Sequence, residues 1–232
     1  MTRSAARARI AVVAVRFTLL DGEYFEALCT VCTALEREGL PFCLVGGAAS
    51  QAWVASLRTG DGARRLSDEP VLHAALRRTR DLDFSTRAPP QTMLRVLNEL
   101  AATSGTNADV LGPRALRLGR VSVAFTVDPS DLAGMEGMYE GFLRRRASVR
   151  LRRGSRVEEI PVIAFEDLLV TKLTRRGDKA KDIADVTQLL AAARDAGRSI
   201  DIDAIRRLLA DRPEALELLR EIEASLATQE TP

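Results

Sequence analysis

A short apolar strand that ends in two glycines and continues into a helix is the feature that most constrains this fold. Residues 42–45 form the apolar run, Gly46 and Gly47 follow it, and residues 48–57 have helical character. Two glycines let the backbone turn tightly, and the N–H groups at the start of a helix can approach a phosphate closely. The segment lacks the Gly-Lys-Ser/Thr of a P-loop and the third glycine of a Rossmann fingerprint. A phosphate-binding turn and a tight strand-to-helix turn without a ligand both remain open.

The order of the other elements predicts an α+β protein with a helical C-terminal part. Before residue 164, apolar spacing predicts a mixture of elements: helices at 23–38 and 91–102, a strand at 82–84, and hairpins over 115–127 and 148–162. After residue 164 it predicts only helices, at 165–175, 178–195, 201–210 and 213–227. We therefore expect an N-terminal extension at 1–22, a mixed core at 23–163 and a helical region at 164–232.

Composition excludes several classes of protein. The 232 residues are 46% hydrophobic with a formal net charge of +2, unlike a disordered or collagen-like chain. No uncharged apolar run approaches the roughly 20 residues of a membrane span, so no membrane association is expected. Arg16 interrupts the apolar stretch near the N-terminus, which favours a loose extension or a strand from Ile10 over a signal peptide. Three cysteines, an odd number, favour a reducing, cytoplasmic location.

The lysines are few and clustered. Of the 34 basic residues, 31 are Arg, and the three lysines are Lys172, Lys179 and Lys181. Arg does not replace Lys where a compact ammonium charge or a shiftable pKa is needed. This ten-residue window is therefore a candidate for a functional segment.

Two carboxylates share one face of the strand predicted at 82–84. Side chains alternate along a strand, so Asp81 and Asp83 point to one side while Leu82 and Phe84 point into the core. Neighbouring carboxylates repel each other unless a cation lies between them, and Mg²⁺ prefers oxygen ligands. The pair predicts a magnesium site, although the Asp-x-Asp pattern also occurs on surface strands and in turns.

These motifs together resemble a known family. The Gly46–Gly47 turn followed by Arg77-x-Thr79-x-Asp81-Leu-Asp83-Phe resembles the nucleotidyltransferase fold of the polymerase-beta type. The chain is more closely similar to the abortive-infection nucleotidyltransferase toxins, the AbiEii/AbiGii group. Those proteins continue with Glu-Asp-Leu-Leu, a Lys and Lys-Asp-x-x-Asp on a helical segment. Here the same order gives Glu166-Asp-Leu-Leu, Lys172 and Lys181-Asp182-x-x-Asp185, and the match spans residues 42–190.

The resemblance implies a magnesium-dependent enzyme that moves a nucleoside monophosphate from an NTP to an acceptor hydroxyl and releases pyrophosphate. Asp81 and Asp83 would bind Mg²⁺, and Lys172 would neutralise phosphate charge. Asp182 or Asp185 would complete the distal motif, and Lys181 and Asp185 could pair at i and i+4. The residues implied to bind the NTP are Gly46, Gly47, Ser50, Arg77, Thr79 and Lys181.

One expected residue has no clear counterpart. Polymerase-like enzymes generally add a third carboxylate from a neighbouring strand, and residues 121–127 offer none, with Ala124 at the position considered first. Asp128 follows on the matching face and is the candidate substitute. The stretch 59–69 is read as an insertion, because the gap between Gly47 and Asp81 is longer than in most compact family members.

The acceptor is not fixed by the sequence. The resemblance implies the 3′ end of tRNA or a protein, together with a partner antitoxin, and the arginine-rich strip Arg144–Arg156 favours RNA slightly over a solvated hairpin face. A small-molecule (antibiotic) nucleotidyltransferase with an acidic acceptor pocket, and a non-catalytic nucleotide- or RNA-binding module, are the alternatives. Cys29 and Cys32 have the spacing of half a zinc site but lie in a helical stripe, and neither Cys43 nor His73 completes it, so core packing is expected.

Overall fold

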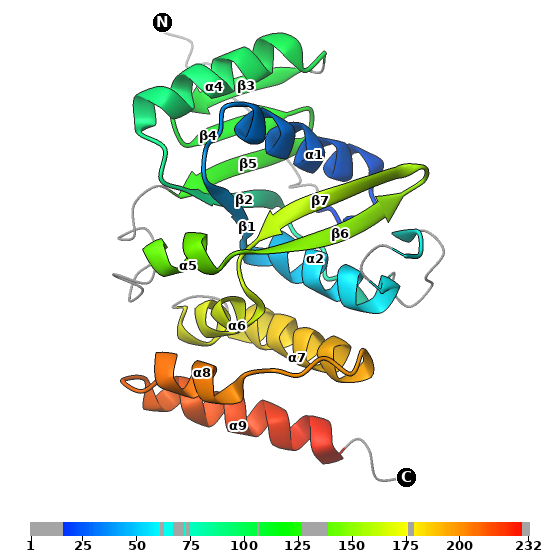
Figure 1. Cartoon of the computed structure of the whole chain (residues 1–232), viewed down its shortest axis with the longest axis vertical. Coiled ribbons are helices and arrows are strands. Elements are labelled where there is room, and N and C mark those ends of the chain that lie inside the picture. Colours follow the sequence, from blue (N-terminus) through cyan, green and yellow to red (C-terminus); the bar gives the residue numbers. More distant parts are fainter. Residues whose placement is uncertain are drawn as a thin grey trace, which may run out of the picture.

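The computed structural model describes residues 16–60, 63–66, 72, 75–105, 107–126, 139–175 and 179–228. Its elements include both helices and strands as far as β7 and are helical thereafter (Figure 1). The first part contains α1 (Gly22–Arg37), β1 (Phe42–Val45), α2 (Gly46–Thr59), β2 (Asp81–Thr86), α4 (Pro90–Thr103), β3 (Ala108–Gly112), β4 (Ala115–Leu118), β5 (Val121–Thr126), α5 (Tyr139–Arg145), β6 (Ala147–Arg153) and β7 (Arg156–Val162). The second part contains α6 (Phe165–Thr174), α7 (Lys179–Asp195), α8 (Ile202–Leu208) and α9 (Pro213–Thr228).

The described strands form one mixed sheet in the order β3-β4-β5-β2-β1-β7-β6. β2 runs parallel to β5 and β1 runs parallel to β7, while the other neighbours are antiparallel. Val45, the last residue of β1, lies opposite Asp83 on β2, and Asp83 lies opposite Ala124 on β5. The register therefore places the Gly46–Gly47 turn beside the Asp-x-Asp pair.

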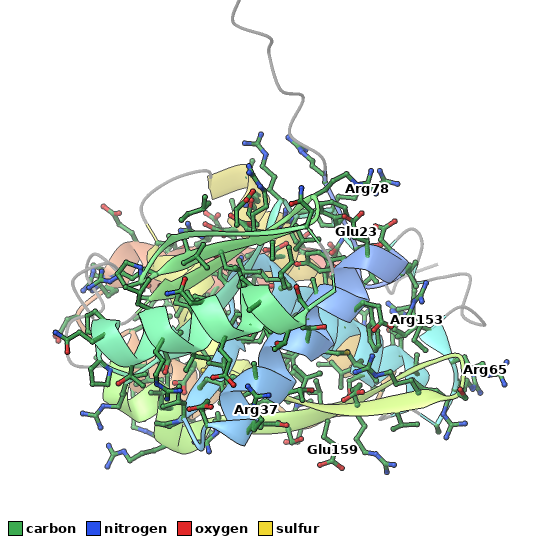
Figure 2. The ribbon with its side chains drawn as sticks, turned by 90° about the horizontal axis from the view of Figure 1, so that it is seen from above. Glu23, Arg37, Arg65, Arg78, Arg153 and Glu159 are labelled. Atoms are coloured by element: carbon green, nitrogen blue, oxygen red, sulfur yellow. The ribbon has the colours of Figure 1, made fainter. Side chains whose placement is uncertain are left out.

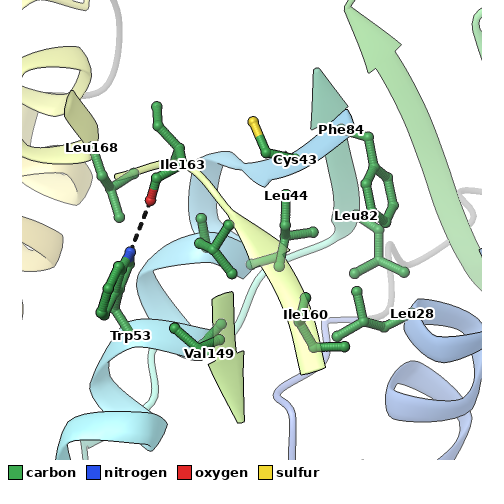
Figure 3. Close-up of a cluster of buried hydrophobic side chains, with 14 of the residues drawn as sticks. Leu28, Cys43, Leu44, Trp53, Leu82, Phe84, Val149, Ile160, Ile163 and Leu168 are labelled. Atoms are coloured by element: carbon green, nitrogen blue, oxygen red, sulfur yellow. Dashed lines mark hydrogen bonds between the residues drawn. The ribbon is translucent and has the colours of Figure 1, made fainter. Parts of the chain in front are cut away.

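Alternation along β2 separates a core face from a polar face. Leu82 and Phe84 are fully buried, and Figure 3 shows Leu82 beside Leu28 of α1. Asp83 points the other way, against Gly46 at the start of α2. Hence α1 and α2 lie on opposite faces of the sheet, and the polar residues of β2 face the same side as α2.

α6 and α7 pack on α2, and α8 and α9 pack on α6 and α7 on the side away from the sheet (Figure 1). Trp53 of α2 donates a hydrogen bond from its indole to the carbonyl of Ile163 (2.9 Å; Figure 3). Its ring also meets that of Phe165 of α6 edge-on. The guanidinium of Arg198, after α7, lies 4.7 Å from the Trp53 ring centroid and 5.1 Å from that of Phe165. These contacts join α2, α6 and the end of α7 into one unit.

The expected α+β class is confirmed, and so are most of the predicted elements. The Gly-Gly pair is the first turn of α2 rather than a linker before it, so this helix begins two residues earlier than predicted. The sequence did not predict β3 and α5. β3 is a short edge strand with a break in its register near Gly112, and α5 is a seven-residue helix containing Gly141, so neither has a strong periodic pattern.

Residues at the predicted N-terminal extension take part in the core. Phe17 and Leu19 are buried, and Phe17 exchanges two backbone hydrogen bonds with Thr79. The strand expected to begin near Ile10 lies outside the described residues, and so do Val127, Asp128 and His73. Cys29, Cys32 and Cys43 are free and buried, as core packing requires, and burial raises the pKa of Cys29 and of Cys43 to about 12. Among the described helices, none has the length and apolar character to span a bilayer.

Candidate functional site

The Gly-Gly turn packs directly on the residues that precede and begin β2. A methyl group on Gly46 would lie 2.6 Å from Oδ2 of Asp83, and Gly46 has a φ of +67°. A methyl group on Gly47 would lie 2.9 Å from Oγ1 of Thr79 and 3.0 Å from Nη2 of Arg77. A side chain larger than hydrogen at either position would therefore displace the neighbouring polar groups.

Asp81 and Asp83 lie side by side on the polar face of β2. Burial, together with the charge of Asp81, raises the pKa of Asp83 from 3.8 to about 6. The hydroxyl of Thr79 donates a hydrogen bond to Oδ1 of Asp81 (3.3 Å). The pair is thus a partly buried carboxylate site that disfavours two negative charges when no cation is bound.

Three cations face these carboxylates from the α6–α7 region. The charges of Arg175, Lys172 and Lys181 act on Asp83 and oppose the rise of its pKa. Lys181 is half-buried, and its pKa is lowered by burial and by the like charges of Arg77, Lys172 and Arg175, with Asp81 acting in the opposite direction. Opposite charges on β2 and in the α6–α7 region are therefore close enough to shift each other's pKa values.

A buried ion network lies next to these charged groups. Nζ of Lys172, which is 2% exposed, donates to Asp185 (2.6 Å) and Asp182 (3.3 Å) of α7. Arg77 donates two hydrogen bonds to the carboxylate of Asp185, from Nε (2.5 Å) and Nη2 (2.9 Å). Burial opposes ionisation of Asp185, but the hydrogen bonds from Arg77 and the charge of Lys172 outweigh it and lower its pKa. The network connects α6 and α7 to the segment that enters β2.

The structure brings most of the sequence-predicted residues together, and several of them are buried. Lys172 is engaged by two carboxylates, and Asp182 and Asp185 are buried by the same contacts. Ser50 is also buried; its hydroxyl donates to the carbonyl of Gly46 (3.3 Å), and it lies near Gln51, Arg77 and Asp185. Four other predicted residues lie where the charges of β2 and the α6–α7 region meet: Asp81, Asp83, Thr79 and Lys181.

The donor set fits a magnesium ion supplied with further ligands by a nucleotide. Mg²⁺ in such sites is held by one or two carboxylates, with phosphates and water completing the octahedron. Asp81 and Asp83 provide two carboxylates on one face, and no group of three metal-binding side chains occurs in the part of the chain that the structure describes. The position opposite Asp83 on β5 is Ala124, which bears no carboxylate.

The arginine-rich strip is largely occupied by intramolecular contacts. Arg145 donates two hydrogen bonds to the buried Asp167, and Arg156 pairs with Glu26 (2.6 Å) and with Glu158. The other contacts of the strip are Arg150 with Glu159, Arg146 with the carbonyl of Leu143, and Arg153 with the carbonyl of Leu20. Figure 2 shows Glu159 extending outward from the same hairpin, so acidic and basic groups are mixed there.

Sequence reasoning missed two residues that support the site. The carboxamide of Gln51 and the hydroxyl of Tyr24 hydrogen-bond to the backbone around β2. Both residues fall in helical stretches whose pattern indicates only a buried face, so no local signal marks their polar groups.

Comparisons with known proteins give a likeness in structure only. No protein-family model matches the chain, and no curated protein matches it. An antigenic nucleotidyltransferase-like protein from Paracoccidioides brasiliensis superposes with a TM-score of 0.49 and 12% identity over 89% of this chain and 95% of that chain. The antibiotic-resistance factor ANT(2'')-Ia superposes with a TM-score of 0.44 and 12% identity over 89% of this chain and 96% of that chain. At these values no residue role is transferred from either protein.

We expect Gly46→Ala to damage the carboxylate site beyond its cost to folding. The added methyl group would displace Asp83, and a left-handed residue other than Gly costs roughly 1–2 kcal/mol. Gly154→Ala is the matched control, because Gly154 has a φ of +61° and open space around it. Thermal unfolding should show similar losses for both variants, whereas a Mn²⁺ titration should show weaker binding for Gly46→Ala alone. Equal Mn²⁺ affinity in the two variants would contradict this role of Gly46.

We expect Asp83→Asn to stabilise the cation-free protein at neutral pH. The pKa of Asp83 is about 6 in the folded state and 3.8 in the unfolded state. Its contribution to the free energy of unfolding is therefore complete below pH 4 and is lost as the pH rises through 6. Asparagine does not ionise, so the variant should gain up to about 3 kcal/mol over the wild type at pH 7.5 and little at pH 4.

The measurement is chemical unfolding in EDTA at both pH values, with Asp203→Asn on the surface of α8 as the control. Adding Mg²⁺ should stabilise the wild type and not Asp83→Asn, since the variant lacks one of the two carboxylates. If Asp83→Asn is no more stable than the wild type at pH 7.5, burial and the charge of Asp81 do not destabilise the ionised Asp83 carboxylate.

Proposed function

We propose that this protein is a magnesium-dependent nucleotidyltransferase. The observation that carries the proposal is the contact between the Gly46–Gly47 turn and the Asp83 carboxylate, with cations facing the same carboxylate from the α6–α7 region. Paired carboxylates suit a divalent cation, and the facing cations suit a polyphosphate. This arrangement agrees with the resemblance to the polymerase-beta-type nucleotidyltransferases found in the sequence.

The residues divide into a metal-binding pair and a phosphate-binding group. Asp81 and Asp83 would hold Mg²⁺, which when bound supplies positive charge to the phosphates of the NTP. Lys181 and Arg175 would bind the phosphates, because they face the carboxylates and Lys181 retains partial exposure. Lys172 would act at longer range, since its ammonium group is held by Asp182 and Asp185.

The transfer step requires a hydroxyl group and a proton acceptor. The acceptor oxygen would attack the α-phosphorus, the bond from that phosphorus to the bridging oxygen would break, and pyrophosphate would leave with both electrons of that bond. Ser122 is exposed and Ala124 and Thr126 are half-buried, so the surface of β5 beside the carboxylates is accessible to an acceptor. Asp83 and Asp128 are the candidates to accept the proton.

The acceptor and the biological role follow only from the sequence resemblance. We propose the 3′ end of tRNA or a protein side chain as acceptor and a toxin role in a toxin–antitoxin or phage-defence system with a cognate antitoxin. Three of the seven arginines in the Arg144–Arg156 strip are paired with carboxylates, which reduces the charge available to RNA there.

A small-molecule acceptor is the second candidate, and one observation favours it. An acidic hollow is lined by residues of α6, α8, α9 and the connection before α8, with four carboxylates, Glu166, Asp201, Asp203 and Glu223, against one cation, Arg206. Such a hollow could attract a polycationic acceptor. Glu166 lies six residues before Lys172, about 9 Å along the α6 axis, so an acceptor held there would have to extend along α6 toward the charged residues near Lys172. A non-catalytic nucleotide-binding module is the third candidate, supported by Ala124 at the position opposite Asp83.

Label transfer tests the proposal. The protein, Mg²⁺ and each α-labelled NTP are incubated with total RNA, with a protein extract, with a panel of aminoglycosides, or alone. We expect label on one acceptor class, with a loss of at least about 1,000-fold in Asp81→Asn/Asp83→Asn, because electrostatic stabilisation of the phosphates is lost. Asp109→Asn is the matched control, since Asp109 lies in register with Asp81 across β5 and β4. Mg²⁺-dependent NTP binding without any transfer would favour the non-catalytic module.

Two lysine variants separate structural from phosphate-binding roles. Lys172→Met should reduce the free energy of unfolding by about 3–5 kcal/mol, because Asp182 and Asp185 would lose a buried partner. Lys181→Met should change stability by less than about 1 kcal/mol yet weaken ATP binding roughly tenfold or more. Calorimetric unfolding and ATP titration in the presence of Mg²⁺ give the two quantities. Strong destabilisation by Lys181→Met with unchanged ATP affinity would reverse the assignment.

A further inference from the structure

The segment that carries Arg77, Thr79 and Asp81 is fixed through its backbone at every second residue. The carbonyl of Arg77 accepts a hydrogen bond from Nε2 of Gln51 (2.9 Å). Thr79 exchanges two backbone hydrogen bonds with Phe17, of 2.6 and 2.8 Å. The carbonyl of Asp81 accepts a hydrogen bond from the hydroxyl of Tyr24 (2.9 Å). The side chains of the same alternate residues make the contacts of the candidate site.

Gln51 connects three chain segments with one carboxamide. It is buried in α2, its Oε1 accepts from the N–H of Leu19 (2.8 Å), and its Nε2 donates to the carbonyls of Phe17 (3.3 Å) and Arg77. A buried amide satisfied on both sides fixes the backbone groups that it contacts. Gln51 therefore sets the distance between α2, which begins at the Gly-Gly turn, and the segment entering β2.

Tyr24 connects α1 to the first residue of β2. Its ring is fully buried and stacks on Phe17 with centroids 5.6 Å apart. Burial and the charges of Asp83 and Asp81 raise the pKa of Tyr24 well above its ordinary value of 10, so its hydroxyl stays protonated and remains a donor. The hydroxyl bonds the backbone of Asp81 from within the core.

We propose that Tyr24 and Gln51 are positioning residues of the divalent-cation site. They hold the Arg77–Asp81 segment in the position at which the carboxylates of Asp81 and Asp83 can bind one cation. This inference rests on the proposed function, because it assigns the support of that same site. Mg²⁺ and Mn²⁺ require oxygen ligands within narrow limits of distance and angle, and loss of groups that orient such ligands typically weakens binding 10- to 100-fold. Neither residue touches the cation.

Tyr24→Phe is the sharpest variant, since it removes one hydroxyl and leaves the packing of the ring. Thr86→Val is its control: Thr86 is buried at the opposite end of the same strand, and its hydroxyl donates to the carbonyl of Pro41 (2.9 Å) and accepts from the N–H of Ala88 (3.2 Å). Both variants lose a hydroxyl–carbonyl hydrogen bond at β2, one beside the carboxylates and one remote from them, and Thr86→Val loses the bond from Ala88 as well. Gln51→Met serves as an independent second variant.

The experiment is a Mn²⁺ titration of the full chain, followed by electron paramagnetic resonance with and without ATP, together with thermal unfolding. We expect Tyr24→Phe and Gln51→Met to weaken Mn²⁺ binding tenfold or more, while Thr86→Val lowers the melting temperature and leaves Mn²⁺ affinity within twofold of wild type. If Tyr24→Phe binds Mn²⁺ like Thr86→Val, the positioning role is overturned and the proposed function stands. If wild type binds no Mn²⁺ with or without ATP, while Asp83→Asn behaves identically, the proposed function itself is overturned.

Discussion

The buried ion network of Lys172, Asp182, Asp185 and Arg77 is the interaction on which the arrangement of the site depends. Two cations and two carboxylates are balanced there, and each is satisfied by hydrogen bonds of 2.5–3.3 Å. Desolvating such charges costs several kcal/mol per ion, so the network is tolerated only when it is complete. Its consequence is geometric. The α6–α7 region is attached to the segment entering β2 by the hydrogen bonds of Asp185 with Lys172 of α6 and with Arg77.

That placement determines which basic groups remain for a ligand. Lys172 is held within the network, and the same contacts bring Lys181 and Arg175 opposite the carboxylates of β2. Burial and the like charges of Arg77 and Lys172 lower the pKa of Lys181, while burial and the charge of Asp81 raise the pKa of Asp83. A cation beside Asp81 and Asp83 and a polyanion beside Lys181 and Arg175 would relieve both effects at once. A magnesium–nucleotide complex combines these two charges in one ligand.

The sequence predicted the parts of this site that depend on local pattern and missed those that depend on packing. Alternation placed Asp81 and Asp83 on one face, and the Gly-Gly turn was predicted beside a strand because apolar runs and glycines are local signals. The roles of Gln51 and Tyr24 depend on partners 26 to 57 residues away, and their polar atoms lie in otherwise apolar helical faces. The same reason explains β3 and α5, which are short and are fixed by neighbouring elements. The burial of Lys172 was also not predictable, because the motif gives residue types and not the depth of each side chain.

The contacts of Lys172 give a physical reason for a lysine at this position, in a chain where lysine is rare. Its ammonium group lies between two carboxylates of one helix, 2.6 Å from Asp185 and 3.3 Å from Asp182, in a fully buried position. A guanidinium is planar and larger and presents its donors as a rigid fork, so it does not fit between two carboxylates that are separated by one turn of α7. Arg77 shows the contrast within the same network, since it approaches a single carboxylate of Asp185 from one side and forms the bidentate contact suited to its shape. In a chain that uses arginine for nearly every other positive charge, the network thus requires one lysine and one arginine at positions that are not interchangeable.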